Sequence, residues 1–301
     1  VAGNTVLGES ALDASVSGAN NTAIGKEALT TLTSGASNTG VGDRALFSST
    51  TPDNNSGFGA LALYTNSTGS GNTAAGSRSL FLNTTGSNNV AFGYQALNSN
   101  TTASNNAAFG RGALQTNTTG ANNTAVGKDA LVLNTTGTGG VAVGYRALDA
   151  NTTGSYNVAI GQDALSGNTT GTQNMGIGVN AGITITTGNY NTAVGPNTIR
   201  GTEVTGSHNV ALGLQALNVI TSGSENVSIG NYSSHKLTTA NNNTAVGYAA
   251  LNDTTTGSNN TAVGRDALLE NTTGGANVAV GAFALDAATE ANNNVGVGYA
   301  S

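Results

Sequence analysis

The sequence has 301 residues, of which 8% are charged and 5% aromatic, and its formal net charge is −6. Because about 25% of residues are charged in ordinary soluble domains, this composition excludes a typical globule with a charged surface. The chain contains no cysteine, which excludes a disulfide framework and a thiolate metal site. Its few basic residues alternate with acids and form no stripe, so we expect no nucleic-acid partner. No stretch approaches the roughly 20 apolar residues of a membrane span.

One glycine recurs through the whole sequence and closes pentads such as residues 123–127, Asn-Thr-Ala-Val-Gly. It returns every 17 residues, except for one step of 18 between Gly195 and Gly213. A short fixed period is typical of a solenoid, because each repeat can bury its side chains only against its neighbours. We therefore expect one array of about 18 coils over residues 1–301, in an all-β parallel β-solenoid (β-roll). Because the chain begins at Val1, we expect it to be a piece of a longer protein.

We call this residue the phase glycine and count positions in each coil from it, so that −1 precedes it and +1 follows it. The phase glycines are Gly8, Gly25, Gly42, Gly59, Gly76, Gly93, Gly110, Gly127, Gly144, Gly161, Gly178, Gly195, Gly213, Gly230, Gly247, Gly264, Gly281 and Gly298.

The residues before the phase glycine predict a short strand. Position −3 is mostly Thr or Val, which suit a pleated surface. Position −2 is small in nearly every coil, which indicates close approach of another backbone, either across the coil or from a second chain. Position −1 is large and apolar, and we expect it to face inward. The residues at −1 include Leu7, Ile24, Val41, Phe58, Phe92, Phe109, Val126, Val143, Ile160, Val194, Ile229 and Val263, with Ala75 as a small exception.

Position −4 is asparagine in every coil but one, where Gly140 replaces it. Stacked asparagines can pair their amides with the coils above and below, so we expect a structural ladder. Its members are Asn4, Asn21, Asn38, Asn55, Asn72, Asn89, Asn106, Asn123, Asn157, Asn174, Asn191, Asn209, Asn226, Asn243, Asn260, Asn277 and Asn294.

After the glycine, two variable residues precede an Ala-Leu pair whose leucine predicts a second inward row. This run is too short for periodicity to separate a strand from one helical turn, and we favour a strand. The coil then closes with a corner such as Asn-Thr-Thr-Gly at residues 83–86. The corner asparagines also form N-x-Thr sequons that could carry glycans, although turn chemistry alone explains them.

The pattern loosens between residues 178 and 237, where one residue is inserted and leucines are replaced. A bend explains these coils better than a loop built for binding, although Tyr232, His235 and Lys236 remain candidate binding residues. Catalysis by His235 with its neighbouring serines is not expected, because adjacent residues on a strand face opposite sides. We expect no metal site, no cofactor and no enzymatic activity.

The repeat at residues 88–102, Asn-Asn-Val-Ala-Phe-Gly-Tyr-Gln-Ala-Leu-Asn-Ser-Asn-Thr-Thr, resembles the repeats of bacteriophage-type tail fibres and related bacterial surface proteins. The pentad at residues 157–161 is similar to the head repeat of trimeric autotransporter adhesins, whose coils are usually somewhat shorter. The match covers essentially the whole chain. The resemblance implies a homotrimeric fibre that attaches to a cell or surface, located outside the cell, on its surface or on a virion.

Three functions therefore compete. The first is a structural and adhesive fibre with a cell-surface or glycan receptor, and the second is a self-assembling extracellular filament or sheath subunit. The third is an ice-binding solenoid, which is disfavoured because paired threonines such as Thr84 and Thr85 are adjacent, so only one of each pair would face out of a strand. The phenylalanines at −1 fit core packing better than sugar contacts. The tyrosines that follow phase glycines are open to either reading; they are Tyr94, Tyr145, Tyr248 and Tyr299.

Overall fold

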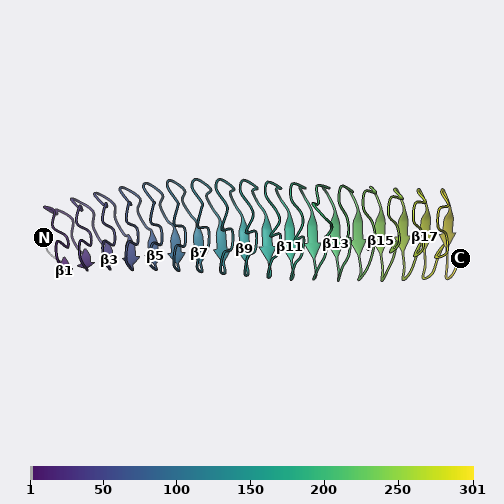
Figure 1. Cartoon of the computed structure of the whole chain (residues 1–301), viewed down its shortest axis with the longest axis horizontal. Helices are drawn as coiled ribbons and strands as arrows, with labels where there is room; N and C mark the ends of the chain where they lie inside the picture. The colour runs from purple at the N-terminus through teal and green to yellow at the C-terminus, as the bar shows by residue number, and fades with distance from the viewer. Residues whose placement is uncertain (1–2) are drawn as a thin grey trace. The chain divides into compact units, whose positions relative to one another are not determined.

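The computed structural model describes residues 3–301 and comprises two compact units, Val1–Thr153 and Gly154–Ser301. Each coil contains one strand of three residues, and residues 3–301 contain no helix (Figure 1). Both units are parallel β-solenoids with a 17-residue period. The fold class predicted from the sequence is confirmed.

The strands coincide with positions −3 to −1 of the pentads. The first unit contains β1 (Thr5–Leu7), β2 (Thr22–Ile24), β3 (Thr39–Val41), β4 (Ser56–Phe58), β5 (Thr73–Ala75), β6 (Val90–Phe92), β7 (Ala107–Phe109), β8 (Thr124–Val126) and β9 (Val141–Val143). The second contains β10 (Val158–Ile160), β11 (Met175–Ile177), β12 (Thr192–Val194), β13 (Val210–Leu212), β14 (Val227–Ile229), β15 (Thr244–Val246), β16 (Thr261–Val263), β17 (Val278–Val280) and β18 (Val295–Val297).

Within each unit, every strand pairs in parallel with the strand one coil further along the chain. In the first unit, for example, Ala91 of β6 lies opposite Ala108 of β7. In the second unit, Thr192 of β12 lies opposite Val210 of β13, so the register is kept across the inserted residue. Equivalent side chains of successive coils therefore stack in rows.

The alternation of each strand sends the small residue at −2 inward and the residues at −3 and −1 outward. Ala91 is fully buried, whereas Phe92 is 42% exposed and Val90 lies at an intermediate depth. The expectation that position −1 forms an inward row is therefore wrong. The interior has room only for Ala, Gly or Ser at −2, because the opposite side of the coil contributes alanine and leucine at +3 and +4.

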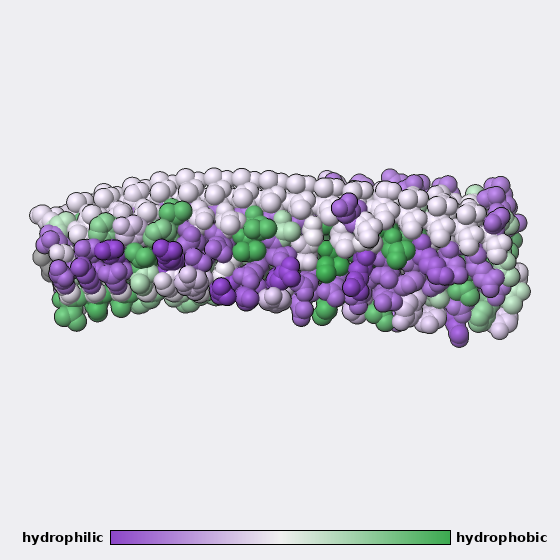
Figure 2. Space-filling model, viewed as in Figure 1, coloured by the Kyte–Doolittle hydropathy of each residue, from purple (hydrophilic) through white to green (hydrophobic). Residues whose placement is uncertain are grey.

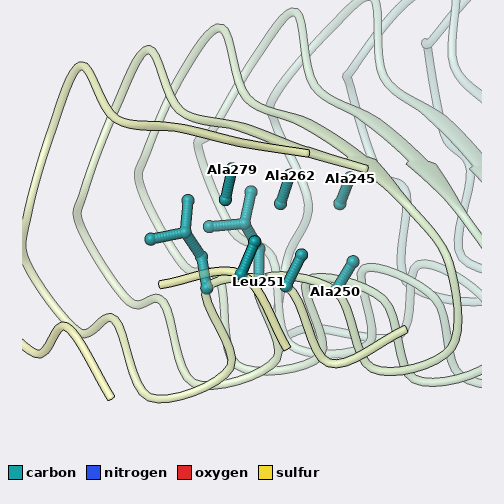
Figure 3. Close-up of a cluster of buried hydrophobic side chains, with 8 residues drawn as sticks. Ala245, Ala250, Leu251, Ala262 and Ala279 are labelled. Atoms are coloured by element: carbon teal, nitrogen blue, oxygen red, sulfur yellow. The ribbon is translucent and has the colours of Figure 1, made fainter. Parts of the chain in front are cut away.

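Figure 3 shows this thin core in the second unit. Ala245, Ala262 and Ala279 point from the strands toward Ala250 and Leu251 on the opposite segment of the coil. In the first unit, a Cβ added at Gly40 would lie 3.3 Å from the carbonyl oxygen of Ala45 and 3.3 Å from Cγ of Leu29. The small residues at −2 thus allow close approach across the coil of the same chain.

The Ala-Leu segment is a pair of tight turns, so the predicted second strand is wrong. In the coil after Gly93, the N–H of Ala96 donates to the Gly93 carbonyl at 3.3 Å, and the N–H of Asn100 donates to the Leu97 carbonyl at 3.2 Å. Leu97 has a positive φ of 50°, a conformation that costs a non-glycine residue about 1–2 kcal/mol. Burial of its side chain and the 3.0 Å hydrogen bond from its N–H to Ala113 offset this cost.

The phase glycine ends the strand and allows the coils to stack closely. Gly110 has a φ of +138°, and a Cβ added there would lie 2.5 Å from the carbonyl oxygen of Gly127 in the next coil. Backbone cannot move aside as a flexible side chain can. Glycine is therefore required at this position both for its backbone conformation and for its lack of a side chain.

Candidate functional site

The asparagines at −4 point inward and bond to the next coil. The side-chain oxygen of Asn106 accepts the backbone N–H of Asn123 at 2.9 Å, and its amide nitrogen donates to the Gly120 carbonyl at 3.0 Å. Asn106 in turn donates its backbone N–H to the side chain of Asn89 at 3.0 Å. Most of these bonds join a side chain to backbone, so the ladder fixes the entry into each strand and the loop that precedes the next one.

Gly140 bonds to the asparagine of the preceding coil but not to the following coil, so the ladder is interrupted there. Its N–H donates to the side-chain oxygen of Asn123 at 2.8 Å, as an asparagine at this position would do. Since glycine has no side chain, it offers no amide to the following coil. The other ladder asparagines from Asn21 to Asn277 are almost completely buried, which makes them structural residues.

A second asparagine ladder occupies position +7, in the corners that the sequence analysis assigned only to turns. The amide nitrogen of Asn117 donates to the side-chain oxygen of Asn100 at 3.0 Å and to the Gly120 carbonyl at 2.9 Å. Asn134 donates to Asn117 at 2.8 Å in the same way. The recurrence of asparagine at this position every 17 residues was visible in the sequence and could have identified the ladder.

This second ladder occupies the asparagines of the corner sequons. Asn83, Asn100, Asn117 and Asn134 are fully buried, and each uses its amide nitrogen in hydrogen bonds inside the coil. A glycan on that nitrogen would have to pass through the packed interior. The folded coils are therefore incompatible with glycosylation at these four asparagines.

The three candidate binding residues lie on the coil that follows Gly230. The ring of Tyr232 contacts the ring of His235 edge-on at 5.8 Å between centroids. Nδ1 of His235 lies 3.3 Å from the carbonyl oxygen of Gln215, and Nζ of Lys236 pairs with Asp253 at 2.9 Å. All three side chains are at least partly exposed, but these contacts engage them with their own and neighbouring coils.

The serines beside His235 face the interior. The Ser233 hydroxyl donates to the Gly230 carbonyl at 2.9 Å, and the Ser228 hydroxyl donates to that of Ser234 at 2.7 Å. Both Ser233 and Ser234 are fully buried. The partly exposed His235 ring contacts Tyr232 and Gln215 instead, whereas a nucleophile and its base are joined by a hydrogen bond.

The inserted residue of the irregular coils is accommodated in a surface loop. Val204 is buried and forms an isolated parallel bridge with Ile185, while Thr202 and Glu203 are exposed. Ile185 and Ile220 replace asparagine at +7 in this region, and both are fully buried. Aliphatic packing therefore takes the place of amide hydrogen bonds in these coils.

The outer face of the sheet carries an apolar row at position −1 in each unit, beside a row at −3 that is Thr or Ser in six of the nine strands of the first unit. In the first unit Phe58, Phe92, Phe109, Val126 and Val143 are between 36% and 44% exposed, and the rings of Phe92 and Phe109 stack at 5.4 Å. The second unit presents the same row through Ile160, Ile229, Val263 and Val280. No strand contains a charged residue. The phenylalanines therefore form an exposed row, and the expectation that they pack in the core is wrong.

Charges gather in the turn just after the phase glycine, at positions +1 and +2. Lys26 pairs with Glu9 at 3.6 Å, and Arg44 pairs with Glu27 at 2.7 Å in the neighbouring coil. The hydrogen bond and charge of Glu27 raise the pKa of Arg44 above its ordinary value. Elsewhere the surface is weakly charged, and Figure 2 shows extended areas of intermediate hydropathy, drawn white to pale lilac.

Residues 3–301 enclose no detectable pocket and contain no cluster of acidic or histidine side chains that could hold a metal ion. No helix capable of crossing a membrane was found in this described part of the chain. In comparisons with known proteins, no family model matches the sequence, and no curated protein matches it either.

Proposed function

We propose that this chain is a structural and adhesive fibre protein that assembles from copies of itself, as a trimer, and mediates attachment outside the cell, at a cell surface or on a virion. The observation that carries the proposal is the apolar row at position −1 on the outer face of the sheet. Three-residue strands spaced about 4.8 Å apart give this face roughly 400 Å² over the nine strands of a unit, shared between the apolar row at −1 and the row at −3. An exposed apolar row that continues from coil to coil is typical of an interaction site.

A second copy of the chain is the partner that best fits this face. The outward rows repeat with the coil spacing, so a second face built from the same rows can align with them in many equivalent contacts. Neither row contains a charge that would have to be desolvated. The resemblance of the repeat to trimeric fibres supports three copies. The absence of a pocket from residues 3–301 favours recognition by a surface over binding in a cavity.

The test is the native mass in solution, measured by light scattering on a size-exclusion column. We expect three times the chain mass of 29.4 kDa. The double variant Val126→Glu/Val143→Glu places two charges on the outer face and should dissociate the assembly with an unchanged circular dichroism spectrum. Leu82→Glu, on an exposed leucine outside the strands, is the matched control and should keep the native mass.

Other masses would change the proposal. A wild-type monomer would contradict self-assembly and raise the ice-binding alternative, which a thermal hysteresis measurement would then test. Open-ended polymers would favour the filament or sheath subunit over the trimer. Dissociation by Leu82→Glu to the same extent as by the double variant would show that the outer face of the sheet is not the interface.

A further inference from the structure

Three exposed residues lie in the turns of successive coils of the first unit, with Arg78 at position +2 and Tyr94 and Arg111 at position +1. Gln95 donates its N–H to the Ser77 carbonyl at 3.1 Å, and Gly112 donates to the Tyr94 carbonyl at 3.0 Å. These bonds stack the turns that carry Arg78, Tyr94 and Arg111. All three side chains are exposed, and the Tyr94 side chain is 47% exposed. With coils about 4.8 Å apart, the backbones of the two arginines are separated by roughly 10 Å along the stack, and the coil that carries Tyr94 lies between them.

These two arginines differ from the other basic residues at positions +1 and +2 because neither has a carboxylate partner within residues 3–301. Lys26, Arg44 and Lys128 each pair with an acid. Arg78 instead places its guanidinium over the ring of Phe81, 5.4 Å from the centroid.

The sequence explains this difference, since no Asp or Glu occurs between Asp53 and Asp129. In a chain of net charge −6, this acid-free stretch forms a local positive region. At the end of this stretch, Asp129 donates its N–H to the Arg111 carbonyl at 3.0 Å, but its carboxylate pairs with Lys128 at 3.5 Å. Arg78 and Arg111 form no ion pair with an acid of residues 3–301, so both can pair with an external anion.

We propose that Arg78, Tyr94 and Arg111 bind an anionic polysaccharide in which charged and neutral sugars alternate, such as a polymer containing uronic acids. This inference rests on the proposed attachment function and names its ligand class. Each guanidinium pairs with a carboxylate through two parallel N–H···O hydrogen bonds. The Tyr94 ring, on the coil between them, packs against the apolar face of the intervening neutral sugar.

The spacing favours this class of polymer. A pyranose unit in an extended chain is similar in length to one coil spacing, so carboxylates on alternate sugars recur at about the separation of Arg78 and Arg111. Nucleic acid fits less well because it carries a phosphate on every nucleotide and binds through many simultaneous cation contacts. A chain of net charge −6 with two unpaired arginines in these turns would repel such a densely charged polymer overall.

The experiment measures binding of the full chain to hyaluronan oligosaccharides, whose uronic acids alternate with neutral sugars, by isothermal titration calorimetry at two salt concentrations. Neutral dextran and single-stranded DNA of similar length are the comparison probes. The test variants are Arg78→Gln/Arg111→Gln and Tyr94→Ala. The matched control, Arg44→Gln/Arg265→Gln, removes the same total charge. Its two arginines also follow phase glycines, at positions +2 and +1, but each pairs with an acid of the chain.

We expect hyaluronan binding that weakens as salt rises, and no dextran binding. Arg78→Gln/Arg111→Gln should lower the affinity at least about tenfold, since it removes two charge-assisted contacts. Tyr94→Ala should lower it about threefold or more, and the control less than about twofold. Absence of hyaluronan binding, equal losses in the test and control arginine variants, or tighter binding to single-stranded DNA would each overturn the inference.

Native mass measured on the same samples separates this inference from the proposed assembly. A monomer that binds hyaluronan through Arg78 and Arg111 would contradict the trimer and leave the glycan site intact. A trimer that does not bind hyaluronan would leave the assembly intact and overturn the site.

Discussion

Asn106 and Asn117 belong to different ladders, yet both donate their side-chain amides to the same carbonyl oxygen, that of Gly120, at 3.0 and 2.9 Å. The shared acceptor links the strand side of the coil to its closing corner. This coil is therefore closed by two independent side chains that converge on one backbone atom. This arrangement recurs in the preceding coil, where Asn89 and Asn100 both donate to Ala103 at 2.9 Å.

The variant Asn106→Ala should destabilise the first unit by about 2 to 4 kcal/mol, because it removes two buried hydrogen bonds and leaves the N–H of Asn123 without its acceptor. Urea denaturation followed by circular dichroism measures this change. Thr119→Ala, at an exposed position of the same coil, should change the free energy of unfolding by less than about 0.5 kcal/mol. Equal effects of the two variants would show that the ladder contributes no more than a surface residue does.

The two ladders should be coupled at Gly120. Asn106→Ala or Asn117→Ala alone leaves the Gly120 carbonyl with one side-chain donor, whereas the double variant removes both. The double variant should therefore lose about 1 kcal/mol or more beyond the sum of the two single losses. A double-mutant cycle measured by urea denaturation gives this coupling energy, and simple additivity would contradict the shared acceptor.

Two glycines of one coil should respond very differently to substitution, although both have positive φ. Gly110→Ala brings a Cβ against the backbone of Gly127 and should cost more than about 3 kcal/mol. At Gly112 a Cβ would meet the side chains of Asp129 and Gln115 and no backbone atom, so Gly112→Ala should cost about 1 kcal/mol. Thermal unfolding of both variants checks this order, and a milder effect at Gly110 would show that the coils can separate locally.

Phe47, Tyr64 and Phe81 stack in three successive coils, with ring centroids 5.1 and 5.2 Å apart. Replacing the central ring by Tyr64→Ala removes both contacts and should lower stability by about 1 to 3 kcal/mol. Tyr94→Ala removes an exposed tyrosine that stacks on no other ring of residues 3–301 and should change stability by less than about 0.5 kcal/mol. A comparison of the two melting temperatures tests whether stacking or side-chain size alone is responsible.

The period, the strands and the asparagines at −4 could be predicted from the sequence because backbone pairing forces equivalent residues of successive coils into rows. Thr22–Ile24 and Thr124–Val126 both lie at positions −3 to −1. A periodic sequence with a β-prone pentad is enough to predict these features. Whether a row faces the interior or the solvent depends on the side chains on the opposite side of the coil.

The inward row at −1 was wrong because burial was inferred from hydrophobicity alone. Asn89 and Ala91 are two residues apart and lie on the same face of the strand, whereas Phe92 lies on the opposite face. An asparagine that must bond inside the coil brings the alanine inward with it, and the phenylalanine then has to face out. Placing Asn89 inside the coil and alternating the following residues would have predicted that the apolar residues at −1 are exposed.

The turn after the phase glycine could not be predicted, because it depends on an uncommon backbone conformation. Leu97 and Leu114 have φ values of 50° and 52°, which leucine adopts only when its surroundings hold it there. Those surroundings are the packed interior of the coil around the side chain and the hydrogen bond from the leucine N–H to the next coil. Four residues of sequence carry no signal for either one.

In the first unit, each coil presents to the next an edge that is complementary to the edge facing it, and this match recurs from coil to coil. The number of coils therefore sets the length of the unit. Removing residues 102–118 joins two coils whose rows already match, so the shortened unit should fold and be about 4.8 Å shorter. Removing only residues 103–118 would shift every later side chain by one place and send alternate residues to the wrong side. Reach along the solenoid axis is thus adjustable in steps of one coil, by duplication or loss of 17 codons at a time.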